Sequence, residues 1–373
     1  MKNKKVVSIV LNNFKNDSRV LKEAISLQNE GYKVKVLALY EEGVLEHEVI
    51  EDIEVHRIRL KSREWAKVRL IQLFKYFELI YRLIKGYRDI DIIHCNDLET
   101  LPLGVILKKF NKKIKIVYDA HEYETETHYS KGVRKKIAQK LEKALIGYAD
   151  AVLTVSNKIA DEYVRLYNIK KPALVLNTPP LKDIEKKDKF REKFDIAPDE
   201  TIFLYQGSLH TARGIEQILE TFKSIENGVV VFMGYGILEP LIKEYAQKYK
   251  NIFFHEAVSP NVVLNYTSSA DFGLSLIEDS CLSYRYCLPN KMFEYTMVGI
   301  AVIVSDLPEM KRVVEEYGVG VVTEDNSVAG LKRAIAKAVK IDKAQLEKNI
   351  DLLKIKYNWQ EQEKILIEVY NEL

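Results

Sequence analysis

The chain has 373 residues, of which 47% are apolar and 30% are charged, a balance typical of soluble globular proteins. The length is enough for two domains. Three cysteines, Cys95, Cys281 and Cys287, exclude a disulfide framework and lack the paired spacing of a zinc site, which indicates a reducing compartment. The apolar runs are too short to cross a membrane, so we expect a cytoplasmic protein.

Charge is divided unevenly between the two halves of the chain. The formal net charge is +3, with about +9 in residues 1–175 and about −6 in the rest. A basic half predicts an anionic partner, either a phosphate-bearing substrate or an anionic membrane surface. We expect no nucleic-acid partner.

Short runs rich in Val and Ile alternate with amphipathic helical stretches in the first half. The pattern predicts strands at 6–11, 34–39, 54–60, 91–94, 114–118 and 151–155, and helices at 18–30, 98–110, 133–148 and 157–168. Buried runs that alternate with helices are typical of a parallel sheet with both faces covered. Right-handed crossovers would make this sheet doubly wound.

Residues 177–199 hold three prolines and many charges and are expected to form a linker, with room for one short helix. The alternation then restarts. It predicts strands at 201–206, 228–233, 251–255, 271–276 and 300–304, and helices at 213–226, 237–249, 261–269, 290–298, 308–316 and 327–340. We therefore expect an α/β protein of two Rossmann-like domains, 1–176 and 200–356, facing a central cleft. A last helix, 357–373, would cross back to the first domain.

Ligands of open α/β sheets bind at the carboxyl ends of the strands, and the loop 206–218 follows a predicted strand. It combines a glycine turn with Arg213 at the start of a helix. Free backbone N–H groups and an arginine at such a place bind phosphate. An ordinary turn with a solvated Arg213 is the alternative. Gly234, after another strand, indicates close approach of the backbone to a ligand.

A second helix start lies in the segment 287–306. Asn290 is predicted to be its N-cap. Lys291 in the first turn opposes the helix dipole, and a bound diphosphate would relieve that misfit. Glu294, on the next turn, could accept hydrogen bonds from two ribose hydroxyls. The alternative is a salt bridge between Lys291 and Glu294.

His121, with Asp119 and Glu122 beside it, follows a predicted buried strand. A histidine among carboxylates could hold sugar hydroxyls or stabilise charge; the alternative is a structural hydrogen bond. The spacing of His121 and His128 does not fit a zinc motif. Asp89-Ile90-Asp91 matches a metal motif of another sugar-transferase class but precedes a strand, so we expect no metal.

Two other loops of the first half carry candidate polar residues. Asp97 precedes a predicted helix and could bind an acceptor or cap that helix. Arg19 follows a first loop that lacks the glycine fingerprint of dinucleotide sites. It could reach a phosphate, or lie on the surface paired with Glu23.

The stretch 61–88 is basic, aromatic and helical in its period. Such a helix could lie on an anionic membrane. The alternative is that its apolar residues form one face of the core.

Six segments together resemble one family. They are NDSRVLKEAISLQNEGYKVKVLAL, HCNDLETLPLG, YDAHEY, ADAVLTVS, YQGSLHTARGIEQI and PNKMFEYTMVGIAVIVSD. In this order and spacing they resemble glycosyltransferase family 4, a retaining group with the GT-B fold, over nearly the whole chain. The resemblance implies a catalytic set of His121, Arg213 and Lys291.

The resemblance also implies binding roles. The donor nucleotide would contact Gly207, Ser208, Arg213, Gly234, Asn290, Lys291 and Glu294; the donor sugar would contact His121, Glu278 and Tyr286; and the acceptor side would hold Asn13, Arg19, Asp97 and Glu122. Two positions depart from the family. Tyr286 stands where many members have a glutamate, whose role Glu278 could take, and Ser208 stands where many have an arginine.

The function that the resemblance implies is retaining hexosyl transfer from a UDP-sugar, or a GDP-sugar, to a glycan or lipid-linked acceptor. It would serve bacterial surface polysaccharide synthesis on the inner face of the cell membrane, without a cofactor. One alternative is a nucleotide-sugar 2-epimerase on the same fold. The other is a non-catalytic nucleotide- or glycan-binding subunit, which Tyr286 and Ser208 make conceivable.

Overall fold

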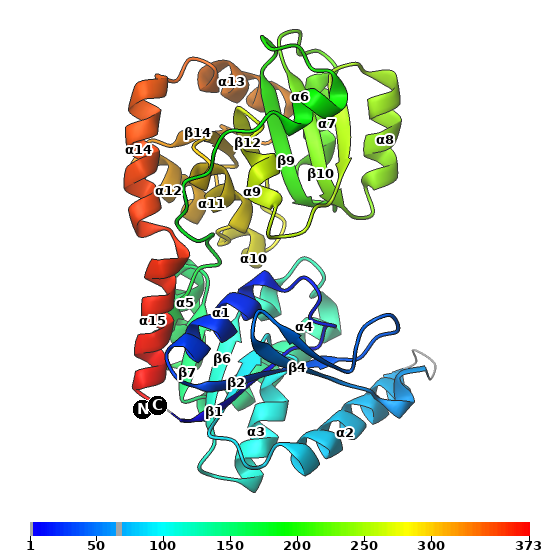
Figure 1. Ribbon diagram of the computed structural model, residues 1–373, viewed down its shortest axis with the longest axis vertical. Helices are drawn as coiled ribbons and strands as arrows, with labels where there is room; N and C mark the ends of the chain where they lie inside the picture. The colour runs from blue at the N-terminus through cyan, green and yellow to red at the C-terminus, as the bar shows by residue number, and fades with distance from the viewer. Residues whose placement is uncertain (1–2, 65–68) are drawn as a thin grey trace. The chain divides into compact units, whose positions relative to one another are not determined.

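The structure is a computed structural model that describes residues 3–64 and 69–373. Two compact units divide the chain (Figure 1). The N-terminal unit contains the described residues up to Val175 together with Glu363–Leu373, and the C-terminal unit contains Leu176–Gln362. Among the described residues, no helix combines the length and the apolar composition needed to cross a membrane.

The described part of the N-terminal unit holds an eight-stranded sheet in the order β3-β4-β2-β1-β5-β6-β7-β8. The strands are β1 (Lys5–Ile9), β2 (Lys33–Leu39), β3 (His47–Ile50), β4 (Ile53–Ile58), β5 (Ile92–Asn96), β6 (Lys115–Ala120), β7 (Ala151–Thr154) and β8 (Ala173–Leu174). All neighbours are parallel except β3 and β4. The central strands β1, β5 and β6 are buried along nearly their whole length because both faces of the sheet are covered.

Helices cover both faces of this sheet, and Figure 1 shows α1 on one side and α2 and α3 on the other. They are α1 (Ser18–Asn29), α2 (Arg69–Gly86), α3 (Leu101–Phe110), α4 (Gly132–Leu145) and α5 (Asn157–Tyr167), with 3₁₀ turns at Lys61–Glu64, Glu124–Glu126 and Ile146–Tyr148. The predicted helix at 98–110 begins at Leu101, later than expected, because residues 98–100 form a turn that follows Asp97, whose φ is 64°. Thr100 precedes the helix, so Asp97 is not its N-cap.

The described part of the C-terminal unit holds a six-stranded parallel sheet in the order β11-β10-β9-β12-β13-β14. Its strands are β9 (Ile202–Ser208), β10 (Val229–Tyr235), β11 (Ile252–Glu256), β12 (Phe272–Ser275), β13 (Ala301–Val304) and β14 (Gly320–Val322). Its helices are α6 (Lys189–Phe194), α7 (Ile215–Phe222), α8 (Glu239–Lys248), α9 (Val263–Thr267), α10 (Leu282–Arg285), α11 (Asn290–Met297), α12 (Pro308–Tyr317), α13 (Val328–Ala338) and α14 (Lys343–Lys356).

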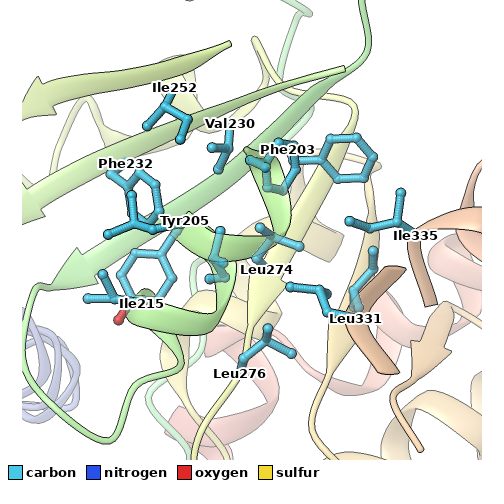
Figure 2. Close-up of a cluster of buried hydrophobic side chains, with 14 of the residues drawn as sticks. Phe203, Tyr205, Ile215, Val230, Phe232, Ile252, Leu274, Leu276, Leu331 and Ile335 are labelled. Atoms are coloured by element: carbon cyan, nitrogen blue, oxygen red, sulfur yellow. The ribbon is translucent and has the colours of Figure 1, made fainter. Parts of the chain in front are cut away.

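One face of this sheet packs against α7 and α13 through a cluster of buried side chains (Figure 2). Phe203, Tyr205, Phe232 and Leu274 come from the strands, and Ile215 opens α7. Burial of apolar side chains of this size stabilises a fold by roughly 1.5–3 kcal/mol each. The core therefore fixes the carboxyl end of β9 and the start of α7, where the phosphate loop was predicted.

The last helix, α15 (Trp359–Asn371), begins in the C-terminal unit and ends in the N-terminal unit. Within the N-terminal unit, the side chains of Leu366 and Tyr370 are fully buried. The Tyr370 hydroxyl lies 2.7 Å from Nδ1 of His94, and the Ser26 hydroxyl donates to Glu363 at 2.7 Å. These contacts make residues 363–373 part of the N-terminal core.

Candidate active-site residues

The loop after β9 carries the first group of predicted site residues in the C-terminal unit. Gly207 and Gly234 face each other in the register of β9 and β10, and a Cβ on Gly234 would lie 1.9 Å from the Gly207 carbonyl oxygen. Gly214, which precedes α7, has a φ of 71° and lies against the backbone of Leu276. Only glycine fits such close approach and such a φ without strain. The turn therefore presents backbone, not side chains, around Arg213.

Arg213 and Lys291 are both placed over aromatic rings. The guanidinium carbon of Arg213 lies 4.5 Å from the centre of the Tyr284 ring, and Nζ of Lys291 lies 3.7 Å from the centre of the Tyr205 ring. Nε of Arg213 is buried and has no hydrogen-bond partner in the described part of the chain. A ring face attracts a cation without neutralising it, so neither side chain is paired with a counter-charge by this contact.

The two cations are close enough to influence each other. Burial, and then the charge of Arg213, lower the pKa of Lys291 to about 7, although Glu294 opposes this shift. A like charge nearby disfavours the protonated form. An anion bound between Arg213 and Lys291 would remove this repulsion, so the pair fits a phosphate-binding role.

The contact of Glu294 differs from the salt bridge to Lys291 that was the alternative to a ribose-binding role. Its carboxylate accepts a hydrogen bond from Nε2 of Gln206, whose own Oε1 accepts from Thr267 at 2.7 Å. Gln206 is a positioning residue that the sequence analysis did not identify; its place at the end of β9, directly before Gly207, was the available signal. Asn290 is the first residue of α11 and Pro289 precedes it, so the prediction of Asn290 as N-cap is wrong by one residue.

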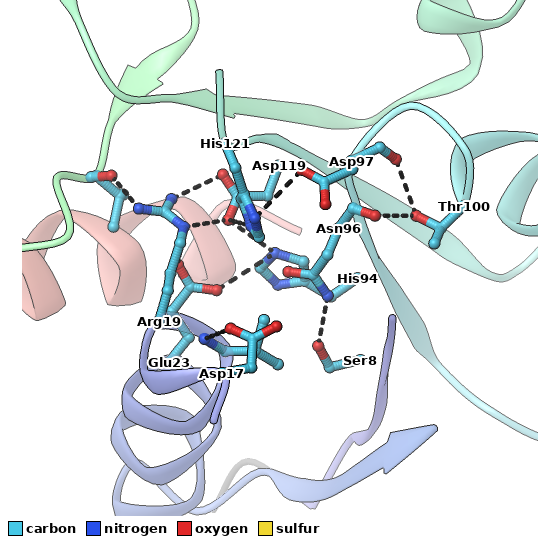
Figure 3. A network of polar contacts seen from close by, with 12 residues as sticks. Ser8, Asp17, Arg19, Glu23, His94, Asn96, Asp97, Thr100, Asp119 and His121 are labelled. Carbon is cyan, nitrogen blue, oxygen red and sulfur yellow. Dashed lines mark hydrogen bonds and ion pairs between the residues drawn. The ribbon is translucent and has the colours of Figure 1, made fainter. Parts of the chain in front are cut away.

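In the N-terminal unit, the predicted residues Arg19, Asp97 and His121 meet around Asp119 (Figure 3). Nε and Nη2 of Arg19 donate to the two oxygens of Asp119 at 2.9 and 2.8 Å. Asp17 caps α1 by accepting from the backbone of Val20 and so fixes the start of the helix that carries Arg19.

Arg19 is only 4% exposed. It pairs with Glu23 as well as Asp119, and its third nitrogen donates to the Val175 carbonyl. The predicted acceptor contact, or a place on the surface, does not fit this burial. Arg19 instead positions Asp119, because a bidentate pair fixes the orientation of a carboxylate.

His121 lies between two carboxylates. Its Nε2 is 3.1 Å from Oδ2 of Asp119, and its Nδ1 is 3.2 Å from Oδ1 of Asp97. Burial would lower the pKa of His121, but Asp119 and Asp97 outweigh it and raise the pKa to about 9. The imidazole is therefore protonated at neutral pH, with both nitrogens as donors. Such a group can stabilise negative charge.

The other two acceptor-side residues, Asn13 and Glu122, make different contacts. Asn13 donates to Glu41, and its carbonyl accepts from Arg57. Glu122 is exposed and contributes to raising the pKa of Glu99, which places it among acidic neighbours. The loops thus bring His121 and Asp97 together, whereas Asn13 contacts Glu41.

Glu23, His94 and Asp119 form a buried group whose ligand atoms lie close enough to surround a metal ion. Arg19, however, already forms ion pairs with both Glu23 and Asp119. Its guanidinium supplies the positive charge that a cation would bring. The group therefore fits a buried ion-pair network better than a metal centre.

Two family models match the chain one after the other. The model described as Glycosyltransferase Family 4 matches residues 18–178, and the model described as Glycosyl transferases group 1 matches residues 186–351. Together they span most of both units. The chain is a family 4 glycosyltransferase.

Known proteins similar to this glycosyltransferase include an uncharacterised glycosyltransferase of Methanocaldococcus jannaschii. It is 22% identical over 318 residues, which are 80% of this chain and 79% of that protein. Sucrose-phosphate synthase from Thermosynechococcus elongatus superposes with a TM-score of 0.81 at 16% identity, covering 99% of both chains. The Anabaena protein HepE, solved in complex with UDP and glucose, gives 0.77 at 12% identity over 100% of both chains. These structures confirm the predicted GT-B fold.

The two departures from the family pattern lie in neighbouring loops of the glycosyltransferase. Ser208 is the last residue of β9, and its carbonyl accepts from the Tyr205 hydroxyl. Tyr286 directly follows α10, whereas Glu278 lies in the loop before that helix. Glu278 accepts a hydrogen bond from Gln217 of α7 at 3.1 Å. This contact orients Glu278 beside the phosphate loop, where it remains a candidate for the sugar.

Proposed function

We propose that this glycosyltransferase moves a sugar from a nucleotide-diphosphate sugar to a glycan or lipid-linked acceptor with retention of configuration. The observation that carries the proposal is the pair of cations, Arg213 and Lys291, held over aromatic rings at the glycine turn and the start of α11. A leaving diphosphate gains negative charge as its bond to the sugar breaks. Charges fixed in advance where that negative charge develops give the largest electrostatic benefit.

In the proposed reaction, the bond between the anomeric carbon and the diphosphate oxygen breaks, and the acceptor hydroxyl forms its new bond on the same face of the sugar. The hydroxyl proton leaves with the diphosphate. Arg213 and Lys291 stabilise the leaving group, Gly207, Ser208, Gly234 and Asn290 bring backbone to the nucleotide, and Glu294 binds the ribose. Because two cations already balance the phosphates, the proposal requires no cofactor and no metal.

For the N-terminal unit we assign His121 to the transferred sugar and Asp97 to the acceptor side. The protonated His121 is fixed by Asp119 and Asp97, so its position does not depend on a ligand. A preset donor costs little reorganisation when a sugar hydroxyl or a developing negative charge approaches it. Glu278 and Tyr286 remain the candidates for the sugar in the C-terminal unit.

UDP-sugars are the proposed donors, with GDP-sugars as the second choice. The similarity to HepE, which is solved in complex with UDP and glucose, supports this choice. The acceptor is proposed to belong to bacterial surface polysaccharide synthesis and to be carried at the inner face of the membrane.

We also propose peripheral contact with an anionic membrane through 61–88, of which residues 65–68 lie outside the described residues. In the described part of α2, Phe74, Phe77 and Tyr81 are 61%, 63% and 65% exposed. Leu79 and Leu83 of the same helix are buried. One face of α2 therefore packs on the unit and another presents aromatic rings, which suits a helix at a lipid interface.

Nucleotide release from UDP-, GDP-, ADP- and CMP-sugars tests the proposal, with and without a lipid-linked acceptor extract. We expect release from one donor, rising when acceptor is added, and loss of at least about a hundredfold in turnover for Arg213→Gln. Proton NMR of the product gives the anomeric configuration. An inverted product, or release from no donor in the presence of acceptor, would overturn the proposal.

A further inference from the structure

The N-terminal unit contains a cavity of about 320 Å³ between strands β2 and β4 and the C-terminal end of α2. Its walls include Lys35 of β2, His56 of β4, Arg59 directly after β4, and Arg82 and Lys85 of α2. None of the residues assigned above to the donor, the sugar or the acceptor lines it. The cavity is therefore separate from the residues proposed for sugar transfer.

The strand register gives the cavity its polar wall. In the parallel pair of β2 and β4, Lys35 lies opposite Glu54, and Leu37 lies opposite His56. Side chains two apart on a strand share a face of the sheet. Lys35 and His56 therefore project from the same face, which is the face toward α2.

Positive charge dominates the lining. Four cationic side chains surround the cavity against one carboxylate, Glu46. Lys35 is paired with Glu54 at 2.9 Å, and Arg82 with Glu78 at 2.9 Å. These two pairs are neutral overall, so the excess charge comes from the remaining cations.

Arg59 and Lys85 are those remaining cations. Neither forms an ion pair with a carboxylate in the described part of the chain. Arg59 lies 4.1 Å from the centre of the Tyr40 ring, a contact that holds the guanidinium in place and leaves it charged. Arg59 and Lys85 thus line one cavity without counter-charges, an arrangement that favours the binding of an anion.

The imidazole of His56 offers a neutral donor in the same wall. Its Nδ1 contacts the hydroxyl of Tyr87, and its ring stacks on His47 with 4.3 Å between centres. Burial, then His47, lower the pKa of His56, and burial raises the pKa of Tyr87 to about 12. Tyr87 therefore keeps its proton and donates to Nδ1, which puts the ring proton of His56 on Nε2.

We propose that this cavity binds a phosphate or diphosphate group, held by Arg59 and Lys85 with His56 as a further donor. The cavity is large enough for such a group. Its negative charge would balance the excess positive charge of the lining. The group could come from a lipid headgroup or from a soluble phosphorylated compound. The proposal goes beyond sugar transfer and does not depend on the donor, so its failure would leave the proposed function intact.

A metal ion is the competing occupant. Glu46, His47 and His56 offer ligand atoms within 4.8 Å of one another. Nδ1 of His56 is already used by Tyr87, and four cationic side chains line the same cavity. Like charges at this distance weaken the binding of a cation, so the lining favours an anion.

Histidine NMR tests the proposal on the full chain, because only seven histidines are present. With ¹³C-labelled histidine, spectra of His47→Gln and His56→Gln would assign the two reporting signals. We expect inorganic pyrophosphate, added to chelator-treated protein, to move both signals saturably. Arg59→Gln with Lys85→Gln should raise the dissociation constant at least about tenfold. This readout is local, so pyrophosphate bound at Arg213 and Lys291 does not disturb it.

A matched control removes the same charge elsewhere on the unit. Lys112→Gln with Lys113→Gln alters two exposed lysines outside the cavity and should change the dissociation constant by less than about twofold. Thermal unfolding followed by circular dichroism would show that both double variants fold. The proposal for soluble anions would be wrong if pyrophosphate did not move the His47 and His56 signals. It would also be wrong if these signals moved equally in wild type and in the Arg59 and Lys85 double variant.

Vesicles separate the two sources of phosphate. Phosphatidylcholine vesicles with and without phosphatidic acid would be sedimented with wild type and both double variants. If only the Arg59 and Lys85 double variant loses binding to vesicles with phosphatidic acid, the ligand is a lipid headgroup. If pyrophosphate moves the histidine signals but this variant still binds the vesicles, the ligand is a soluble compound. The proposal fails if neither arm responds, or if the two histidine signals saturate with Zn²⁺ and not with phosphate.

Discussion

The side chains of Arg213 and Lys291 contact aromatic rings and form no ion pair with a carboxylate in the described part of the chain. A carboxylate would fix a cation but also cancel its charge, whereas a ring face only attracts it. Tyr205 and Tyr284 can therefore hold both cations near each other before a ligand arrives. The depressed pKa of Lys291 is the sign that this arrangement is unfavourable without an anion.

That pKa leads to a prediction about pH. In the free enzyme the pKa of Lys291 is about 7, and a bound diphosphate would raise it because it favours the charged form. UDP affinity should be full below pH 7 and should fall as pH rises, approaching about tenfold per pH unit. Calorimetry in two buffers of different ionisation enthalpy should show proton uptake on binding at pH 8.

The control for this pH effect is Lys291→Arg. Arginine stays protonated throughout this range, so the variant should bind UDP with no proton uptake from this position. Equal proton uptake by wild type and variant would assign the effect to another group.

Glu294 supports a second prediction at the residue scale. Replacing it with Ala should weaken binding of the donor nucleotide about 10- to 100-fold, because hydrogen bonds to a charged acceptor are worth roughly 1.5–3 kcal/mol. Titration with UDP and with the corresponding deoxyribose nucleotide measures the effect. Wild type should discriminate between the two and the variant should not. Glu239→Ala on α8, which removes a half-buried carboxylate paired with Lys243, should bind like wild type, and an unchanged affinity of Glu294→Ala would exclude the ribose contact.

Several side chains could be placed from the sequence, and others could not. Arg213 and Lys291 were predicted because a glycine turn and a helix start are local patterns. The pairing of Arg19 with Asp119 joins residues 100 positions apart. Likewise Tyr284 and Gln206 reach their partners only through the packing of the sheet. Contacts of this kind depend on tertiary structure, which no local pattern contains.

At the scale of elements, the sequence predicted the long buried strands and missed the short ones. β3 was missed because its hairpin turn consists of Glu51 and Asp52, both with positive φ, whereas the usual signal is Asn-Gly or Asp-Gly. β8 and β14 have two and three residues, too few for a periodic pattern. The helix α14 was also missed, although α15 was predicted from its apolar spacing.

The helix α2 supports a prediction about membranes. Phe74→Ser with Phe77→Ser should reduce the affinity for anionic vesicles, measured by sedimentation, at least about a hundredfold, because each buried aromatic ring contributes roughly 1.5–3 kcal/mol. Turnover of a soluble acceptor analogue should be unchanged.

The matched control for α2 lies on another helix. Leu352 and Ile355 of α14 are 62% and 65% exposed, so Leu352→Ser with Ile355→Ser removes a comparable apolar surface. If both double variants lose vesicle binding equally, the contact is not specific to α2.

At the scale of the whole molecule, two units with separate cores share one helix, α15. Its last residues complete the N-terminal unit: Tyr370 is fully buried and contacts His94, and its carbonyl accepts from the hydroxyl of Tyr32. The N-terminal unit is therefore built from the beginning and the end of the given sequence.

Removal of residues 363–373 should destabilise the N-terminal unit by about 3–5 kcal/mol, because it exposes apolar surface and leaves His94 without a partner at Nδ1. Hydrogen-exchange mass spectrometry would measure this as lost protection in β1, β5 and β6. Protection in β9 and β10 should stay within error, which serves as the internal control. Equal loss in both units would mean that the deletion acts on the fold as a whole.

The same helix sets an order for folding during synthesis. A ribosome makes residues up to Val175 before residues 363–373, so the first part of the N-terminal unit leaves the exit tunnel without the segment that covers His94. The C-terminal unit, Leu176–Gln362, has all its residues before that segment is made. The unit whose translation begins first therefore keeps an incomplete core until residues 363–373 have been made.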